Sequence, residues 1–486
     1  MTMLIETDFV RPRRTKIVAT LGPATAERDK LRDLLAAGVN VCRLNFSHGT
    51  DADHERMLNM VREVSQELGQ YTAVLGDLCG PKIRLNEVPK GMVLETGEEL
   101  RFIRGAAPAV KGALTISYPH FVDEVRIGDR IYIDDGLVRL LVVDRTEDAI
   151  HCRCTVGGAI STRKGVNLPD TPLSISALTE KDRTDLHWAV KHHLDYIALS
   201  FARKPHDVIE LRQILKASDS DLPIIVKIEK SEAIKHLDEF IAISDGIMVA
   251  RGDLGVEMDI WQVPLMQKDM ARKARDANKP CIVATQMLQS MVANPMPTRA
   301  EVSDVANAIF DEVDAVMLSA ESASGEYPVE SVEMMDRIVR TTEAYLDRSP
   351  RPEYSSIWAS ENAIASTVAL GAVRMAERIQ ASAVAVWSTS GATARMVSQH
   401  RMHIPVVGLT RSEAVCRRLN LVYGIIPVQV EPVAHPGRMA EMVDAIVISK
   451  HLAKADDRIV VVSSTKPTVV GTTDMTLVHR VRETSG

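Results

Sequence analysis

The chain alternates between strand-like and helix-like segments with a regularity that few folds can accommodate. Short β-branched, apolar runs are followed by longer stretches in which apolar residues recur at helical spacing. Over residues 15–347, with one interruption, the alternation gives about eight strands and as many helices. Eight such units predict a closed (β/α)8 TIM barrel. An open doubly wound sheet is the alternative, but the Gly-x-Gly-x-x-Gly fingerprint typical of it is absent.

The interruption, between residues 86 and 166, has a different character. Its short β-branched runs, separated by Gly-, Pro- and Asp-rich turns, predict a small all-β domain inserted into the barrel. After a linker at 349–352, a second α/β rhythm begins. We expect a first part of the barrel at 1–80, an inserted β-barrel lid domain at 81–170, a second part of the barrel at 171–348 and a C-terminal α/β regulatory domain at 349–486.

Composition limits the partners of such a chain. The 486 residues are 45% hydrophobic and 25% charged, as in ordinary soluble proteins, and the net charge is −7. No basic stripe dominates, which argues against nucleic acid, and no apolar run is long enough to span a membrane. The six cysteines form no metal or disulfide pattern and no apolar leader begins the chain, so we expect a cytoplasmic protein with reduced thiols.

Two strand ends near the middle of the chain carry a cation and two carboxylates. Lys227 and Glu229 stand two apart at the end of a predicted strand, so their side chains point to the same face. Asp253 follows the next strand, after Gly252, where the backbone can approach a ligand closely. A single strand that runs into a charged loop would mean little. Two strands with complementary charge favour a divalent cation beside an anionic substrate.

Other strand ends add polar groups, and in a barrel all of these ends meet at one rim. Arg43, Asn45 and Ser47 alternate onto one face of the second strand, where an arginine, an amide and a hydroxyl suit a phosphate. Later strand ends contribute Asp77, Lys82, Arg84, Thr285 and Ser319.

These motifs together resemble the pyruvate kinase family. The matching stretches are Arg-Leu-Asn-Phe-Ser-His-Gly at 43–49, Gly-Asp-Leu-Cys-Gly-Pro-Lys-Ile-Arg at 76–84, Arg-Lys-Gly-Val-Asn-Leu-Pro at 163–169, Val-Lys-Ile-Glu at 226–229, Met-Val-Ala-Arg-Gly-Asp-Leu-Gly at 248–255 and Ala-Thr-Gln-Met-Leu at 284–288. The resemblance covers essentially the whole chain. It implies phosphoryl transfer from phosphoenolpyruvate to ADP, giving pyruvate and ATP, by a homotetramer.

The resemblance also implies roles for the residues at the rim. Glu229 and Asp253 would hold Mg²⁺ or Mn²⁺, Lys227 would contact the transferring phosphoryl group, and Arg43 would be a second clamp. The substrate carboxylate and the protonation of the enolate would involve Gly252, Asp253, Thr285 and Ser319. The nucleotide would contact Asn45, Ser47, His48, Arg84 and Lys164, the last from the inserted domain closing as a lid.

One position departs from the family pattern. Many members carry Glu where this chain has Lys82, and bind K⁺ beside that carboxylate; the corresponding region here consists of Asn45, Ser47, Asp77, Leu78 and Lys82. A tethered ammonium can supply the charge of the ion and repels K⁺ at short range. We therefore expect an enzyme that does not require K⁺. The alternative is that Lys82 points to solvent and the cation site persists.

The C-terminal domain contains a hydroxyl-rich loop before a predicted helix, with the residues Ser388, Thr389, Ser390, Gly391, Ala392 and Thr393. Such a loop can bind an anion, although the same residues also make ordinary helix caps. In the family it resembles the effector-phosphate pocket. Because the loop at 464–468 lacks the Trp and Arg associated with fructose 1,6-bisphosphate, we expect a sugar monophosphate or AMP.

Two other functions stay open from the sequence. A lyase or aldolase acting on phosphoenolpyruvate or pyruvate could share the metal carboxylates, but it would not need Arg84 or Lys164. A non-catalytic sensor of phosphometabolites should have lost Lys227 or a metal carboxylate, and this chain has lost neither. Thermal stabilisation by ADP with Mg²⁺ would separate the kinase from the lyase.

Overall fold

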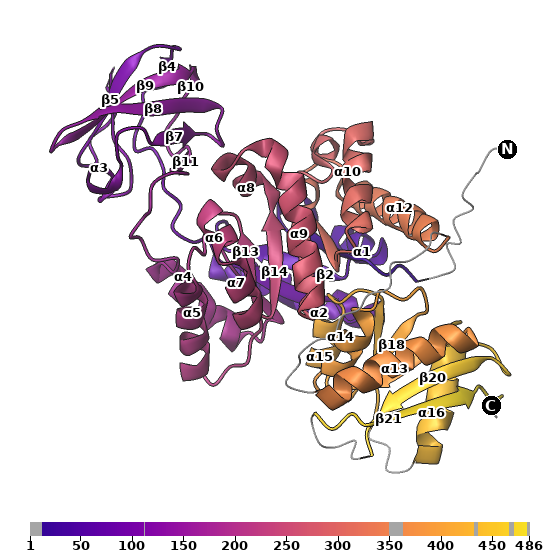
Figure 1. Cartoon of the computed structure of the whole chain (residues 1–486). Coiled ribbons are helices and arrows are strands. Elements are labelled where there is room, and N and C mark those ends of the chain that lie inside the picture. The colour runs from indigo at the N-terminus through magenta and orange to yellow at the C-terminus, as the bar shows by residue number, and fades with distance from the viewer. Residues whose placement is uncertain (1–11, 111, 349–362, 432–435, 466–470, 484–486) are drawn as a thin grey trace.

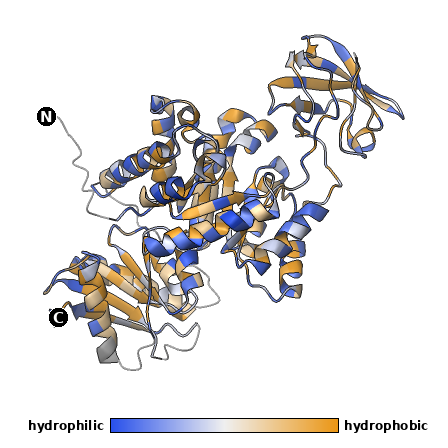
Figure 2. Ribbon diagram, turned by 180° about the vertical axis from the view of Figure 1, so that it is seen from behind, coloured by the Kyte–Doolittle hydropathy of each residue, from blue (hydrophilic) through white to orange (hydrophobic). Residues whose placement is uncertain are grey.

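The computed structural model describes residues 12–110, 112–348, 363–431, 436–465 and 471–483. A barrel lies in the middle of the molecule, the inserted β domain extends from one of its ends, and the C-terminal domain packs at the other (Figure 1). The strands of the barrel and of the C-terminal sheet are mainly hydrophobic, whereas the outer helices carry many hydrophilic residues (Figure 2).

Eight parallel strands close the barrel in the order β1-β16-β15-β14-β13-β12-β3-β2, which confirms the predicted TIM barrel. They are β1 (Lys16–Thr20), β2 (Val41–Asn45), β3 (Ala73–Asp77), β12 (Tyr196–Leu199), β13 (Ile224–Ile228), β14 (Gly246–Ala250), β15 (Cys281–Ala284) and β16 (Ala315–Leu318). Closure joins β1 to β16, with Lys16 beside Ala315. Nearly every side chain of these strands is buried, because helices cover one face and side chains fill the interior.

The long helices around the barrel are α1 (Arg28–Ala36), α2 (Asp51–Glu67), α4 (Glu180–Lys191), α5 (Pro205–Ala217), α9 (Val263–Asp276), α10 (Arg299–Phe310) and α12 (Pro328–Leu346). Three of them begin at a threonine whose hydroxyl accepts the N–H of the third residue beyond it: α2 at Thr50, α4 at Thr179 and α10 at Thr298. Each is a capping box, which explains why the helix starts there.

Shorter helices correct the prediction in two places. The single helix expected at 231–243 is divided at His236 into α6 (Ser231–Lys235) and α7 (Leu237–Ile243). A helix, α8 (Arg251–Glu257), follows β14 directly where a loop was expected. Tertiary contacts fix its start, because Arg251 donates to Asp304 at 2.7 Å and to the Thr285 carbonyl at 2.9 Å. Another short helix, α11 (Ala320–Ala323), follows β16.

The inserted domain is built on a six-stranded sheet in the order β11-β7-β8-β9-β5-β6, with a separate pair β10-β4. Its strands are β4 (Val93–Leu94), β5 (Glu99–Ile103), β6 (Ala113–Leu114), β7 (Arg130–Ile133), β8 (Val138–Arg145), β9 (Ala149–Val156), β10 (Gly158–Ala159) and β11 (Val166–Asn167). The strand expected at 113–118 is shorter, because Ile116 pairs only through an isolated bridge to Leu85. A short helix, α3 (Phe121–Glu124), was not expected.

The C-terminal domain contains one five-stranded sheet in the order β19-β18-β17-β20-β21. The strands are β17 (Ala383–Trp387), β18 (Val406–Thr410), β19 (Ile425–Gln429), β20 (Arg458–Ser463) and β21 (Met475–Arg480), and the helices are α13 (Ala363–Ile379), α14 (Ala392–Ser398), α15 (Glu413–Leu419) and α16 (Pro436–Ser449). Strand β21 pairs antiparallel with β20 at the edge, as predicted. The linker expected at 349–352 lies outside the described residues.

The C-terminal domain closes the lower end of the barrel with the segment 417–425, which we call the base plug. Leu421 is fully buried and belongs to the same apolar cluster as the residues inside the barrel. The hydroxyl of Tyr196, at the start of β12, donates to the Arg418 carbonyl at 2.7 Å. At the start of β1, Lys16 Nζ donates to the Ile425 carbonyl at 2.7 Å.

A buried ion pair reinforces this junction. Arg401, from the C-terminal domain, contacts Asp314, just before β16, with Nη1 at 3.1 Å and Nη2 at 2.8 Å from the carboxylate. The same carboxylate accepts the backbone N–H groups of Tyr423 and Cys281 at 3.1 Å each. The Asp314 carboxylate is therefore fully hydrogen-bonded although it is inaccessible to solvent.

Within the described residues, no helix has the length and apolar character needed to cross a membrane.

Candidate active site

Lys227 lies at the centre of the upper rim, the carboxyl-terminal end of the barrel. Its Nζ is 3.4 Å from both Asp77 Oδ1 and Glu229 Oε2, and it donates to the hydroxyl of Ser200 at 2.7 Å. Burial alone would lower the pKa of Lys227, but Asp77 and Glu229 raise it well above its ordinary value. The ammonium is therefore a fixed positive charge in a largely dehydrated setting.

Arg43 adds a second cation to the same cluster. Its Nε donates to Asp77 Oδ2 at 2.6 Å, and its Nη1 donates to the Thr20 hydroxyl at 3.1 Å. Burial opposes ionisation of Asp77, yet Lys227 and Arg43 hold its pKa below the ordinary value. The two cations that the sequence placed on different strands thus share one buried carboxylate.

Glu229 has the environment of a cation ligand. Its Oε1 accepts the backbone N–H of Phe201 at 2.5 Å, whereas the fully buried Oε2 has no hydrogen-bond partner among the described residues. Burial raises the pKa of Glu229, and the nearby charge of Asp253 raises it further, against the opposing effect of Lys227. A buried carboxylate oxygen that accepts no hydrogen bond, and has only a lysine ammonium 3.4 Å away, fits a divalent cation with oxygen ligands.

The described residues contain no cluster of three or more His, Cys, Asp or Glu side chains that could hold a metal ion. The two carboxylates Glu229 and Asp253 could each supply a ligand, with substrate and water oxygens completing the shell. This is usual for Mg²⁺, which keeps several waters and binds through one or two carboxylates and substrate phosphates.

Backbone and hydroxyl donors gather beside these carboxylates, where β14 and β15 end. The N–H of Gly252 donates to the Thr285 hydroxyl at 2.7 Å, and that hydroxyl donates to the Ala284 carbonyl at 2.7 Å. A Cβ at Gly252 would lie 3.3 Å from Thr285 Oγ1, a tight contact that a larger residue could make only if Thr285 shifted. Thr285 has a φ of 72°, a strained conformation of the kind found at functional sites.

Comparison with known proteins fits this arrangement. Residues 12–332 match the family model of the pyruvate kinase barrel domain, and residues 366–479 match that of the pyruvate kinase alpha/beta domain. The chain belongs to the pyruvate kinase family. It is 43% identical to a pyruvate kinase of Agrobacterium vitis, over 96% of this chain and 98% of that protein.

Two further pyruvate kinases match nearly the whole length of this chain. The chain is 41% identical to pyruvate kinase 2 of Synechocystis sp., over 98% of this chain and 80% of the relative. It is 39% identical to a pyruvate kinase of Geobacillus stearothermophilus, over 97% of this chain and 81% of the relative. The protein is accordingly a phosphotransferase of the pyruvate kinase type, with phosphoenolpyruvate and ADP or ATP as substrates and a divalent metal as cofactor.

Ser319, the other residue expected near the enolate, lies at the end of β16, where α11 begins. It is half-buried, and its backbone N–H donates to Glu321 Oε2 at 2.7 Å. Its position on the upper rim agrees with the predicted location, and its role in protonation stays a prediction.

The residues expected to bind the nucleotide form two separate groups, one at the end of β2 and one in the inserted domain. At the end of β2, Asn45 Oδ1 accepts the N–H of Ser47 at 3.1 Å, and Ser47 and His48 are exposed. In the inserted domain, Arg84 donates to the Arg163 carbonyl at 2.9 Å, and Lys164 Nζ is 2.7 Å from Asp134. One group belongs to the barrel rim and the other to the inserted domain.

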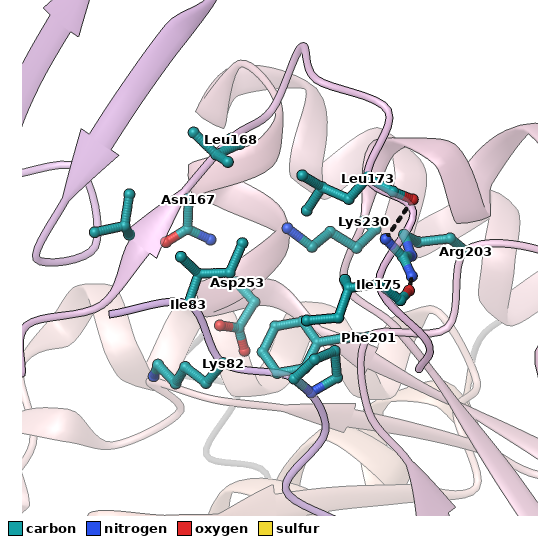
Figure 3. Close-up of a pocket in the computed structure, with 12 residues that line it drawn as sticks. Lys82, Ile83, Asn167, Leu168, Leu173, Ile175, Phe201, Arg203, Lys230 and Asp253 are labelled. Carbon is teal, nitrogen blue, oxygen red and sulfur yellow. Dashed lines mark hydrogen bonds between the residues drawn. The ribbon is translucent and has the colours of Figure 1, made fainter. Parts of the chain in front are cut away.

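A pocket lies where the inserted domain joins the barrel (Figure 3). Lys82 and Asp253 both line it, and Lys82 is exposed. A Cβ at Gly165 would lie 3.2 Å from Lys82 Cε, so the lysine stem rests against the inserted domain. Leu78 is instead buried in the barrel core. The oxygens of Asp77 are occupied by Arg43, Lys227 and Ser200.

Two groups of hydrogen bonds at this pocket connect the barrel to the inserted domain and to the chain that follows it. Arg203 donates to the carbonyls of Leu173 and Ile175, as the dashed lines in Figure 3 show. At the end of α8, Glu257 Oε1 accepts from Lys230 Nζ at 2.6 Å and from the Asn167 amide of β11 at 3.0 Å. Glu257 therefore joins a rim lysine to a strand of the inserted domain.

The expected effector loop lies in the C-terminal domain, far from the rim (Figure 1). Gly391 has a φ of 81° and begins α14, and a Cβ there would lie 3.0 Å from a methyl carbon of Leu419. The hydroxyls of Thr393 and Thr473 are 2.7 Å apart, so the loop faces a second hydroxyl-bearing segment. Residues 466–470 of that neighbouring loop lie outside the described residues.

Sequence reasoning missed the contribution of β12. The residues directly after this strand, Ser200 and Phe201, contact Lys227 and Glu229 respectively. An apolar strand followed by Ser-Phe carries no charge, and it therefore gave no signal of chemistry. The rule that the active site gathers at all carboxyl-terminal strand ends could have drawn attention to it.

Proposed function

We propose that the protein is a Mg²⁺-dependent, K⁺-independent pyruvate kinase regulated by a phosphorylated effector. The single observation that best supports the chemistry is the cluster around Lys227, a buried ammonium set between two carboxylates. Transfer of a phosphoryl group needs positive charge and alignment more than covalent catalysis. Lys227 and Arg43 supply that charge from adjoining positions on the rim.

The bound Mg²⁺ (or Mn²⁺) would neutralise phosphate charge and align the phosphoenolpyruvate oxygens. Glu229 and Asp253 would hold it. Lys227 would contact the phosphoryl group during transfer, and Arg43 would bind the same group from the side of β2. The Gly252 and Asp253 backbone, together with the Thr285 hydroxyl, would seat the carboxylate.

The protonation step would use hydroxyl groups. Phosphoryl loss leaves the enolate of pyruvate, whose methylene carbon must gain a proton. Thr285 is proposed to deliver it, with Ser319 relaying a proton through water. The nucleotide would be held by Asn45, Ser47 and His48 on the barrel and by Arg84 and Lys164 on the inserted domain, which would close as a lid.

Independence from K⁺ rests on Lys82. Lys82 is exposed and lies on the wall of the pocket that Asp253 also lines. We propose that its ammonium replaces the monovalent ion that other members bind near Asn45, Ser47, Asp77 and the position of Leu78. A K⁺-free assay at matched ionic strength tests this, and a large rate increase on adding K⁺ would contradict it.

The loop 388–393 is proposed to bind the phosphate of a sugar monophosphate or AMP. Its support is a backbone turn at Gly391 that leads into α14, with hydroxyls from Ser388, Thr389, Ser390 and Thr393 nearby. Replacing Thr389 and Thr393 by Ala should abolish activation by such effectors while leaving the unactivated rate unchanged. Unaltered activation would exclude this loop.

A homotetramer in the cytoplasm is the proposed assembly and location. Ile260 and Trp261, just before α9, are 70% and 72% exposed, and Leu265 on α9 is 63% exposed. Large apolar side chains gathered on one surface usually mark an interface. Sedimentation of the protein and of Trp261→Glu would test the assembly.

The decisive experiment measures pyruvate formation from phosphoenolpyruvate, ADP and Mg²⁺ by the native chain and by Lys227→Met, with and without K⁺. Activity that ignores K⁺ and collapses in the variant is the expected result. Activity that needs K⁺ would remove the argument from Lys82 alone. No pyruvate under any condition, with candidate effectors present, would contradict the kinase.

A further inference from the structure

We propose that Ser200 is a positioning residue that sets the direction of the Lys227 ammonium, and that the end of β12 is the element that aligns the catalytic cation with the metal carboxylate. This inference rests on the proposed role of Lys227 in phosphoryl transfer. It concerns a strand whose sequence carries none of the charged residues of the site.

The geometry around the Ser200 hydroxyl defines its role. Its oxygen accepts a hydrogen bond from Lys227 Nζ at 2.7 Å, and its proton goes to Asp77 Oδ1 at 3.2 Å. The two carboxylates beside Nζ are further away, at 3.4 Å each. Ser200 thus makes the shortest described contact of the ammonium, and it is a neutral one.

A neutral partner matters because two anions compete for this cation. Without Ser200, the ammonium would move onto Asp77 or onto Glu229 and form a tight ion pair. Either movement displaces the ammonium from the midpoint between the two carboxylates. A hydroxyl that accepts from Nζ while donating to Asp77 holds the ammonium between the two carboxylates and leaves its charge available to a phosphoryl group.

The neighbouring residue does the same for the metal carboxylate. Phe201 donates its backbone N–H to Glu229 Oε1 at 2.5 Å. To do so it adopts a φ of 54°, which residues other than glycine rarely take. The two consecutive residues after β12 therefore fix Lys227 through a side chain and Glu229 through the backbone.

The turn after β3 holds these two residues in place. Gly80 has a φ of 66°, and a Cβ there would lie 2.6 Å from the Phe201 ring and 3.3 Å from Ser200 Cβ. No larger residue fits such a contact. In addition, the N–H of Leu78 donates to the Ala198 carbonyl at 3.1 Å. Ser200 is only 1% exposed as part of this packed layer, so water cannot easily replace its hydroxyl.

The test compares Ser200→Ala and Ser200→Cys with the native enzyme and with Ser331→Ala. The cysteine keeps the volume of the side chain but is a weak hydrogen-bonding group. Ser331 is a matched control, because it is equally buried and its hydroxyl bonds only the Tyr327 carbonyl on α12, according to the described contacts. The measurements are kcat, the KM for phosphoenolpyruvate, the Mn²⁺ dissociation constant by proton relaxation, and the thermal midpoint.

Both Ser200 variants should lose about 10- to 100-fold in kcat, the size expected for one hydrogen bond to a charged group. The KM for phosphoenolpyruvate and the Mn²⁺ constant should change by less than about threefold, because Arg43 and the Phe201 contact to Glu229 remain. Ser331→Ala should retain native kcat with a thermal midpoint lowered as much as that of Ser200→Ala.

Native kcat in Ser200→Cys would overturn the inference, since packing rather than the hydroxyl would then matter. A kcat loss accompanied by an equal loss of Mn²⁺ affinity would overturn it too, because the defect would then be a general collapse of the rim. The proposed function fails separately: it is contradicted if Lys227→Met retains activity, whereas an inactive Lys227→Met with a fully active Ser200→Ala refutes only the role of Ser200.

Discussion

The buried carboxylates at the two ends of the barrel differ in how fully their oxygens are hydrogen-bonded. At the lower end, Asp314 has every oxygen occupied, by Arg401 and by two backbone N–H groups. At the upper rim, Glu229 is equally buried, but within the described residues its Oε2 accepts no hydrogen bond and has only the Lys227 ammonium 3.4 Å away, and burial raises the pKa of Glu229. The lower end stabilises the fold, and the rim keeps unsatisfied groups for a ligand. Substitutions at the rim should therefore lower activity with little change in stability, and substitutions at the lower end should lower stability with little change in activity.

The largest effect should come from Glu229→Gln at the rim. The amide can still accept the Phe201 N–H, but it binds a divalent cation poorly. We expect kcat to fall about 1,000-fold, as when a key electrostatic group is removed, while the free energy of unfolding stays equal or rises slightly. Steady-state kinetics and urea unfolding measure both quantities. A strongly destabilised variant would break the comparison at its upper end.

Arg401→Met should lower stability and leave kcat nearly unchanged. It leaves the Asp314 carboxylate buried without its cation, which costs about 3–5 kcal/mol of unfolding free energy. The kcat under saturating substrate should stay near the native value, because the rim is untouched. Asp221→Ala is the control: it breaks an exposed ion pair to Arg418 in the same junction, where Asp221 is 90% exposed, and should cost less than about 1 kcal/mol.

Leu421→Ala should have a somewhat smaller effect at the same end. The change leaves a cavity below the apolar layer inside the barrel, worth about 3 kcal/mol in unfolding free energy. Leu137→Ala, at a 69% exposed leucine of the inserted domain, should change stability by less than about 0.5 kcal/mol. If both substitutions destabilise equally, the plug does not seal the barrel.

Lys16 differs from the other charged groups at the lower end of the barrel, because burying its ammonium lowers stability. Burial, with a contribution from Arg13, lowers its pKa from 10.5 to about 7. Between pH 7 and 10.5 the unfolded chain therefore binds one more proton than the folded chain, so stability rises with pH across this window and the full penalty applies below it.

The smallest expected effect is the rise of stability with pH that Lys16 causes. Relative to Lys16→Met, the native protein should gain about 1.4 kcal/mol of unfolding free energy per pH unit between pH 7.5 and 9.5. Urea unfolding at four pH values would show it. Parallel pH profiles for the two proteins would mean that Lys16 keeps its proton, paired with Glu343 and Asp314 as the neighbouring anions.

The parts of the fold that sequence predicted well are those determined locally. Each barrel strand is a self-contained apolar run, and the capping threonines mark where helices begin. Helix α8 was missed because its first residue is fixed by Asp304, far along the chain. The short strands of the inserted domain, such as β4 and β10, form only through pairing with each other.

The site was predictable in its charged residues and not in its supports. Lys227 and Glu229 could be placed on one face from their spacing, and the structure brings them together. Ser200 and Phe201 are as important to their geometry, but an uncharged strand end gives no chemical signal. Likewise, no local pattern pairs Arg401 with Asp314, because tertiary packing alone brings them into contact.

The base plug also has a consequence for the order of events during protein synthesis. Strand β1 pairs with β16, and the buried Lys16 at its start bonds to Ile425, so the first strand made must wait for segments made far later. Until Leu421 has left the ribosome, the apolar lower end of the barrel has no cover, and exposed surface of this kind invites aggregation or chaperone binding. The C-terminal domain would thus complete the folding of the barrel.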